Sequence, residues 1–313
     1  MKKDIIYTIL TSMLLLSCQK CKSPLKPAND CKEIGSEPVQ GFIYSINKSY
    51  SYPSFYKEGI SYIKVVPYDS NSNQSYDIQL CYYNIQTQKN NIITHNLPNI
   101  PSGEIDNDWN VFTGQYNVIW KIKMNGDSLT QLTNQVGFFP AWNPVTKIIS
   151  YTSSGQLNFI THLGINLPFN DTIYVTNGAA WSYGGYKLAF FGKSMKNGFS
   201  GLQIYDWSTQ VSKLLIPNNS FINEGRISWA EDEKYLIFNA DNNIYKIDCQ
   251  TLTIDTIKKG CESINYLFPF LKNERVVYTK VEKERKGDTL NIKSGIYQLD
   301  MLTNKEEEIY LSD

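Results

Sequence analysis

The sequence has little of what marks several large protein classes. Its 313 residues include two histidines, His95 and His162, and beyond Cys18 it has no Cys-x-x-Cys pair. Such a chain offers few ligands to a transition metal, so we expect no metal site and no cofactor. Basic and acidic side chains number 30 each, and the chain therefore lacks the positive field that binds nucleic-acid phosphates. No apolar run reaches the roughly 20 residues of a membrane-spanning helix.

Aromatic side chains, in contrast, are abundant. They make up 13% of the residues, and 22 of them are tyrosines. Aromatic residues favour β-strands over helices. Because 42% of the residues are apolar, the chain can bury a sizeable core and does not have the composition of a disordered protein. No stretch shows the periodicity of an amphipathic helix, so we expect an all-β fold.

The first eighteen residues have the organisation of a secretion signal. Lys2 and Lys3 precede a mostly apolar stretch, residues 5–16, which has the length of a signal-peptide core. The stretch ends in Leu15-Leu16-Ser17-Cys18, a sequence that resembles the lipobox of bacterial lipoproteins. This resemblance implies a signal peptide over residues 1–17 and a lipid on Cys18 that anchors the protein in a membrane. An ordinary secretory signal followed by an unrelated cysteine is the alternative.

Residues 18–40 have the composition of a tether, with three prolines, mixed charges and few apolar side chains. In lipoproteins kept at the inner membrane, an aspartate often follows the modified cysteine, whereas here Gln19 follows it. The resemblance therefore implies a protein anchored in the outer membrane, facing either the periplasm or the cell surface.

Five further cysteines follow Cys18, an odd number for an oxidising compartment. Cys21 and Cys31 could close a loop within the tether, and Cys249 and Cys261 could link two neighbouring strands. Cys81 lies inside a strand pattern, where we expect it to be a small buried apolar residue.

A repeated unit begins near residue 50. Three segments share a tryptophan followed nine positions later by an aromatic residue, with turn residues between them. This order predicts strand, turn and strand, with the tryptophan in the core. The pairs are Trp142 with Tyr151, Trp181 with Phe190, and Trp229 with Phe238. We call the second residue of each pair the second landmark. With weaker copies included, the second landmarks are Ile63, Phe112, Tyr151, Phe190, Phe238 and Tyr278, at spacings of 49, 39, 39, 48 and 40 residues.

A separate landmark, the hairpin landmark, follows in most copies. A strand ends in Asp or Asn, and a threonine stands three positions later. A short polar side chain at this place can accept hydrogen bonds from the turning backbone, which suits a tight hairpin. The third copy, near residues 157–162, lacks this landmark. The pairs are Asn84 with Thr87, Asp206 with Thr209, Asp248 with Thr251, and Asp300 with Thr303.

Each period of about forty residues thus supplies four short antiparallel strands that cannot bury both faces alone. Repeated radially, such units form a β-propeller, and we predict six blades of four strands over residues 41–313. A β-sandwich is the alternative, although it does not predict aromatic landmarks that recur in phase.

The repeat resembles that of TolB-type propellers, in which Trp-Ser-Pro-Asp-Gly precedes an apolar strand. Trp142-Asn143-Pro144 and Trp181-Ser182-Tyr183-Gly184 keep parts of this string over a resemblance that covers about residues 50–311. The resemblance implies the fold and no particular activity. Similar blades occur in dipeptidyl peptidase IV, whose hydrolase domain carries a Gly-x-Ser-x-Gly elbow. Gly198-Phe199-Ser200-Gly201 is one residue too short for that elbow.

The repeat also predicts how the ring closes and where a ligand binds. We expect residues 42–46 to pair with the last blade, beside residues 306–311, because a closed ring leaves no open sheet edge.

Loops joining second to third strands share a face with the connectors between blades, and three of them are long: 67–76, 192–200 and 281–294, the last a solvated hairpin. The candidate ligand-face residues are Phe138, Phe139, Asn218, Glu224 and Arg226, and Trp207 is a further exposed contact residue. Packing between blades is the alternative role for the two phenylalanines.

The function that these observations favour is a lipid-anchored, non-catalytic module that binds a protein or glycan partner in the cell envelope. A hydrolase or lyase acting on envelope polysaccharide is the second hypothesis, with Asp106, Asp108 or Glu224 as carboxylates near the central channel. Such an enzyme needs two carboxylates roughly 5–10 Å apart. A purely structural spacer is the third.

Overall fold

The computed structural model describes residues 43–46, 49–67, 76–95, 97, 104–106, 108–169, 171–217, 225–286 and 289–311. Strands and the turns between them make up this part of the chain, together with one 3-10 turn at Gln115–Asn117. In these ranges no helix is long and apolar enough to cross a membrane. The all-β prediction is therefore confirmed.

The strands follow the chain in regular order. The first thirteen are β1 (Ile43–Ile46), β2 (Ser49–Tyr56), β3 (Gly59–Pro67), β4 (Tyr76–Asn84), β5 (Lys89–Thr94), β6 (Glu104–Asp106), β7 (Trp109–Thr113), β8 (Ile119–Lys123), β9 (Thr130–Gln131), β10 (Phe138–Trp142), β11 (Ile149–Ser153), β12 (Gln156–Ile160) and β13 (Asn166–Leu167). The others are β14 (Ile173–Trp181), β15 (Lys187–Ser194), β16 (Ser200–Asp206), β17 (Val211–Pro217), β18 (Ile227–Trp229), β19 (Tyr235–Ala240), β20 (Asn243–Asp248), β21 (Ile254–Lys258), β22 (Ile264–Lys272), β23 (Arg275–Lys286), β24 (Thr289–Asp300) and β25 (Lys305–Ile309).

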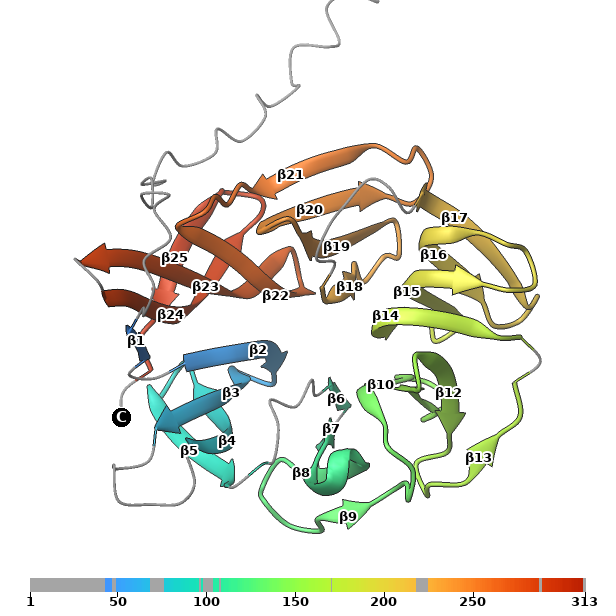
Figure 1. Cartoon of the computed structure of the whole chain (residues 1–313), viewed down its shortest axis with the longest axis horizontal. Helices are drawn as coiled ribbons and strands as arrows, with labels where there is room; N and C mark the ends of the chain where they lie inside the picture. Colours follow the sequence, from blue (N-terminus) through green and yellow to red (C-terminus); the bar gives the residue numbers. More distant parts are fainter. Residues whose placement is uncertain are drawn as a thin grey trace, which may run out of the picture.

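Consecutive strands pair antiparallel in runs of four, and these runs are arranged around a centre as the blades of a β-propeller (Figure 1). The first strand of each run lies nearest the centre, and the fourth lies at the rim. The innermost strands are β2, β6, β10, β14, β18 and β22. The β-sandwich alternative is excluded by this radial arrangement.

Hydrogen bonding divides the strands into five sheets: three of four strands, one of five and one of eight. The eight-stranded sheet contains two runs of four, β10–β13 and β14–β17. A single residue pair, Gln156 with Tyr174, joins them through β12 and β14. The prediction of four-stranded antiparallel blades is thus confirmed, while the number of separate sheets is five because this one pair bridges two runs.

The landmark residues found in the sequence are buried in the core of the propeller. The second landmarks of all the copies, from Ile63 to Tyr278, are buried in the second strand of their blades. Trp142, Trp181 and Trp229 end first strands and are buried as predicted. Burying an apolar side chain of this size stabilises the fold by about 1.5–3 kcal/mol, so each period contributes similar anchors.

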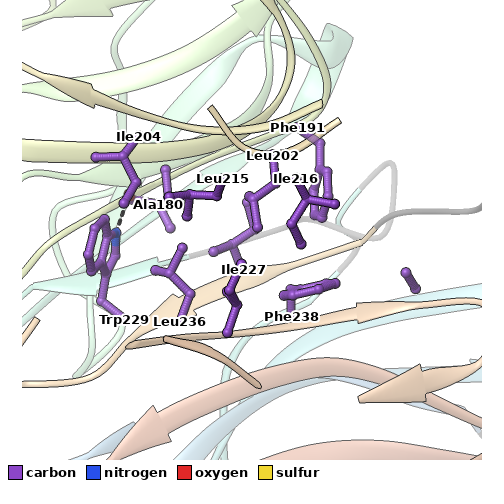
Figure 2. Packing of buried hydrophobic residues seen from close by; sticks show 13 residues of the cluster. Ala180, Phe191, Leu202, Ile204, Leu215, Ile216, Ile227, Trp229, Leu236 and Phe238 are labelled. Carbon is purple, nitrogen blue, oxygen red and sulfur yellow. Dashed lines mark hydrogen bonds between the residues drawn. The ribbon is translucent and has the colours of Figure 1, made fainter. Parts of the chain in front are cut away.

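The core lies mostly between blades rather than within them. Figure 2 shows one such junction, where Phe191, Leu202 and Ile216 of one blade face Ile227 and Phe238 of the next. The Trp229 indole Nε1 donates a hydrogen bond of 2.9 Å to the Ala180 carbonyl across the same junction. Neighbouring blades therefore share one apolar layer, which no blade could complete by itself.

The N-terminal strand closes the ring as predicted. β1 pairs with β24 in parallel, with Ile43 opposite Thr289 and Ile46 opposite Ile292. β25 pairs antiparallel with the other half of β24, from Ile296 to Asp300. The two ends of the described chain thus lie one after the other along the same long strand.

The hairpins between third and fourth strands confirm the role predicted for Asp and Asn. Asp248 Oδ1 accepts hydrogen bonds from the backbone N–H groups of Gln250 and Thr251, at 2.8 and 2.7 Å. Asp206 and Asp300 likewise each accept two backbone N–H groups, and Asn84 Oδ1 accepts the N–H of Thr87. In the blade without this landmark, Thr161 Oγ1 accepts from the N–H groups of Leu163 and Ile165 instead.

Predictions for the cysteines are partly wrong. Cys249 is a free thiol and Cys261 is disulfide-bonded, so these two do not pair with each other. Cys81 is a free buried thiol, as expected, and burial raises its pKa to about 11. Cys18, Cys21 and Cys31 lie outside the described residues.

Candidate functional site

Two faces of the propeller differ in what they carry. Loops joining second to third strands emerge on one face together with the connectors between blades; we call this the long-loop face. The turns between first and second strands emerge on the other, the turn face. Of the predicted long loops, 192–200 is shortened because β15 and β16 leave only residues 195–199 between them, and 281–294 is the predicted hairpin of β23 and β24. Residues 68–75 lie outside the described ranges.

Phe138 and Phe139 start the innermost strand β10 and are half-buried. Their ring centroids are 6.4 Å apart. A Cβ on Gly178 of the next blade would lie 2.5 Å from Phe139 Cβ, so the backbones of β10 and β14 approach closely here. The close approach gives Phe139 a packing role between blades.

Arg226 bridges blades that are far apart in the sequence. Its guanidinium donates to the Pro53 carbonyl at 2.8 Å and to Ser54 Oγ at 2.9 Å. The same group lies 4.8 Å from the ring centroid of Phe270. Arg226 thus connects the chain before β18 with β2 and β22, so its planar donor fork is used in holding the ring together.

The remaining predicted residues divide into those that the structure places and those that it does not. Asn218, Glu224 and the side chain of Asp106 lie outside the described parts. Asp108 is on the turn face, where it accepts from Tyr56 at 2.6 Å and pairs with Lys57 at 2.7 Å. Lys57 holds the pKa of this exposed carboxyl below its usual range. Asp108 is therefore not a channel carboxylate.

Trp207 is not the exposed contact residue that its turn position predicts. Its ring is stacked on Phe169 with 6.0 Å between centroids and meets Trp181 edge-on at 5.3 Å. Phe159 completes the contact at 4.7 Å. These neighbours come from two blades and their connector, so Trp207 closes a junction between blades.

Sequence reasoning missed a recurring aromatic bulge in the innermost strands. Tyr52, Phe139 and Phe268 all have positive φ, at 50, 52 and 54°. Each lies where the pairing with the second strand shifts register. A bulky residue rarely adopts this conformation, so a recurrence in three blades marks a built feature.

A sequence signal for this bulge exists. Each of the three aromatic residues is followed by proline: Pro53, Pro140 and Pro269. Because proline has no N–H, it can occupy the bulge without leaving a donor unpaired. An aromatic-proline pair 10–12 residues before the second landmark could therefore have revealed these positions.

At the seam between β2 and β22 two of these rings meet. Tyr52 and Phe268 are stacked with their centroids 3.9 Å apart and their planes 23° apart. Burial raises the pKa of Tyr52 to about 12, although the charge of Arg226 lowers it in part. The Phe268 N–H donates to Oδ1 of buried Asn239, which also accepts from the Arg226 N–H at 3.0 Å. The aromatic seam is thus fixed from two sides.

The turn face carries a series of contacts between neighbouring turns. Glu233 accepts from Gly184 N–H at 2.7 Å and from Lys187 Nζ at 2.9 Å. Burial alone would raise the pKa of Glu233, but these hydrogen bonds outweigh it and lower the pKa. Other junctions use other groups: Tyr56 and Lys57 with Asp108, Asn143 with the Gly185 carbonyl, Tyr235 with Glu274, and Arg275 over the Phe55 ring.

Among the described residues, no three His, Cys, Asp or Glu side chains come close enough together to hold a metal ion. His95 has one carboxylate neighbour, Asp77, at 3.1 Å.

Comparison with known proteins supports the fold. No family model and no curated protein matches the sequence. A putative TolB from Agrobacterium tumefaciens is similar with a TM-score of 0.55 and 12% identity over 73% of this chain and 86% of that one. The β-propeller domain of the Trilobed protease from Pyrococcus furiosus is similar with a TM-score of 0.52 and 13% identity, over 85% of this chain and 98% of that one. An oligogalacturonate lyase from Vibrio parahaemolyticus has a TM-score of 0.50 and 10% identity, over 83% of this chain and 77% of that one. At such identities the likeness shows the fold alone, and that fold is the β-propeller of TolB and of peptidase propeller domains.

Proposed function

We propose that the protein is a lipid-anchored, six-bladed propeller of the cell envelope that binds a protein or glycan partner without catalysing a reaction. Counting β10–β13 and β14–β17 as separate blades gives six, since one residue pair joins them. Residues 1–17 are the signal peptide, Cys18 carries the lipid, and residues 18–40 tether the propeller, residues 41–313, to the outer membrane. The propeller faces the periplasm or the cell surface.

One observation supports the binding function: four large apolar side chains are exposed on loops of the long-loop face, although turns of the other face also expose such side chains, Tyr186 among them. Tyr116 in the β7–β8 turn is 77% exposed, and Val136, Met195 and Phe199 are also exposed. Single exposed apolar residues are ordinary, but loops on a rigid scaffold are where binding residues concentrate. The TolB-like fold supports the same function.

Photo-crosslinking in intact cells tests which face binds the partner. A benzophenone amino acid is placed at Tyr116 or Phe199 on the long-loop face. Tyr186, which is 60% exposed on the turn face, is the matched control. We expect a defined crosslinked species from the first two positions and none from Tyr186. Equal capture from both faces, or capture from Tyr186 alone, would contradict the proposal.

The anchor has its own test. Cys18→Ala removes the acceptor for the lipid while leaving the propeller unchanged. We expect the variant to leave the membrane fraction and the native protein to remain in it. If the variant stayed in the outer-membrane fraction, the lipid would not be the anchor.

The polysaccharide hydrolase or lyase is the second candidate. It is less well supported because Asp108, one of its three candidate carboxylates, is ion-paired on the turn face. Release of reducing ends or unsaturated ends from acidic oligosaccharides, abolished by Asp106→Asn or Glu224→Gln, would establish an enzyme in place of a binding module.

A further inference from the structure

The connector between β21 and β22 carries a disulfide-bonded cysteine, Cys261. A turn fixes this cysteine in place, since the Cys261 N–H donates to the Ile264 carbonyl at 2.8 Å and the Ile264 N–H donates back at 3.2 Å. Just before it, the Gly260 N–H donates to Oδ1 of Asn243 at 2.8 Å. Cys261 also packs, partly buried, against the apolar core that the fifth and sixth blades share. The connector therefore holds the Cys261 sulfur in a defined position between two blades.

The partner of Cys261 can be narrowed by elimination. The structure contains one chain, and its sequence has six cysteines. Two of them, Cys81 and Cys249, are free thiols. The other three all precede β1 and lie outside the described residues: Cys18, Cys21 and Cys31. The disulfide therefore joins the connector before β22 to the segment before β1.

The sheet of the last blade gives the distance that this segment has to cover. Its strands lie in the order β1, β24, β23, β22, so Ile43 and the start of β22 are three strand spacings apart, about 15 Å. Along β23, Ile43 lies level with Lys286. Ile264, which follows the connector, lies level with Glu282. This offset adds about 13 Å along the sheet, so Ile43 and the connector are about 20 Å apart.

Of the cysteines in the segment, Cys31 matches this distance best. It precedes Ile43 by 12 residues, and Cys21 precedes it by 22. A coil of 12 residues has an average end-to-end distance of about 19 Å, and one of 22 residues about 26 Å. Closure is most favourable where this average equals the span. Pairing at Cys21 would also press the connector against the membrane, because Cys21 stands three positions after Cys18.

We propose that a disulfide between Cys31 and Cys261 links the N-terminal segment covalently to the connector before β22. Excluding Cys18 as the partner rests on the proposed function, since the lipid occupies its sulfur. As the S–S bond forms, the two thiols lose two protons and two electrons. Thiol–disulfide exchange passes these to the disulfide of an oxidised thiol oxidoreductase, which becomes two thiols.

This disulfide shortens the tether. Without it, 25 residues lead from Cys18 to Ile43, whereas with it 13 residues lead from Cys18 to the bonded Cys31. The reach of the chain from the membrane falls from about 85 Å to about 45 Å. Because connectors between blades lie on the long-loop face, the disulfide keeps this face of the last blade near the membrane.

Peptide mapping tests the pairing on the full-length protein, purified from membranes and alkylated without reduction. Trypsin places the four cysteines in separate fragments: Cys18 in 18–20, Cys21 in 21–22, Cys31 in 23–32 and Cys261 in 260–272. We expect fragments 23–32 and 260–272 to be linked and to separate on reduction. An alkylated Cys261, or its linkage to Cys21 or to a second chain, would overturn the proposal.

The same map separates this proposal from the lipid anchor. The mass of fragment 18–20 shows whether Cys18 carries a lipid. A fragment without lipid, together with linked 23–32 and 260–272, would contradict the anchor and leave the disulfide proposal standing. Linkage of Cys18 to Cys261 would contradict both.

Serine variants test the effect of the bond on stability. Cys31→Ser and Cys261→Ser should each lower the melting temperature by about 3–8 °C. The double variant should melt no lower than the less stable single variant, because each substitution removes the same bond. Cys21→Ser, which removes a cysteine outside the pair, is the matched control and should melt like the native protein. Additive losses in the double variant, or an equal loss in Cys21→Ser, would contradict the pairing.

Discussion

Single carboxylates organise the rim of the propeller. Asp206, Asp248 and Asp300 each accept two backbone N–H groups in a hairpin, and Asn84 fills an equivalent place. Hydrogen bonds from Ser208, from Thr251 and from Thr303, respectively, are the largest causes that lower the pKa values of the three aspartates. A charged acceptor is therefore used where a neutral one also fits.

This arrangement makes part of the stability pH-dependent. A carboxyl whose pKa is lower in the folded state stabilises the fold above its unfolded pKa, near 3.8, and that contribution is lost as pH falls through the folded value. We expect Asp206→Asn/Asp248→Asn/Asp300→Asn to keep nearly the native free energy of unfolding at pH 7, because Asn retains the acceptor oxygen. Between about pH 5 and pH 2 its stability should fall less steeply than that of the native protein. Urea unfolding at several pH values measures this, and identical slopes would contradict it.

Residue-scale predictions from the sequence succeeded where burial or turn capping follows from the residue's place in its own strand or hairpin. The tryptophans, the second landmarks and the hairpin aspartates are of this kind. Trp207 failed because its burial depends on Phe169, which belongs to the connector before β14. Arg226 was placed at the correct end of its blade, but its partners Pro53 and Ser54 are distant in the chain. Contacts of such separation leave no local pattern.

Turns between first and second strands act as connecting elements as well as reversals of the chain. At the junction between the β14–β15 and β18–β19 turns, one side chain, Glu233, satisfies the Gly184 N–H and Lys187 together. The pKa of Glu233 is lowered, so its carboxyl is charged at neutral pH and accepts both hydrogen bonds.

Removing this acceptor should weaken the junction. We expect Glu233→Ala to lower the free energy of unfolding by about 1–3 kcal/mol, because the Gly184 N–H loses its partner in a part-buried place. Glu233→Gln keeps an acceptor for that N–H and should lose less. Denaturant unfolding compares the two with the native protein. Equal losses would mean that the ion pair with Lys187, rather than the backbone contact, holds the junction.

In the last blade two strands share β24, and one of them, β1, comes from the other end of the ring. β25 covers residues Ile296–Asp300 and β1 covers Thr289–Ile292. The repeat phase predicted both, since both segments stand at the fourth-strand position. The parallel direction of β1 was not predictable, because the sequence pattern of a strand is the same in either direction.

Deleting Ile43–Ile46 tests what β1 contributes. We expect the ring to remain folded, because the apolar core shared by the first and last blades, with Tyr62 packed near Val277 and Ile296, is kept, and the melting temperature to fall by a few degrees. Amide hydrogen exchange should rise over residues 289–292, which lose their neighbour, and stay slow over Ile296–Asp300. If exchange rose equally over both halves of β24, β1 would be needed for closure as a whole.

The unlike chemistry of the turn-face junctions has a consequence for assembly. Tyrosine with aspartate, asparagine with a glycine carbonyl, glutamate with glycine and lysine, and arginine with phenylalanine each fit one neighbour only. Repeated units of similar sequence are prone to mispairing and to exchange between chains. A blade docked out of order would here face the wrong polar groups, so these mismatched seams would favour the native order during folding and discourage blade swapping between molecules.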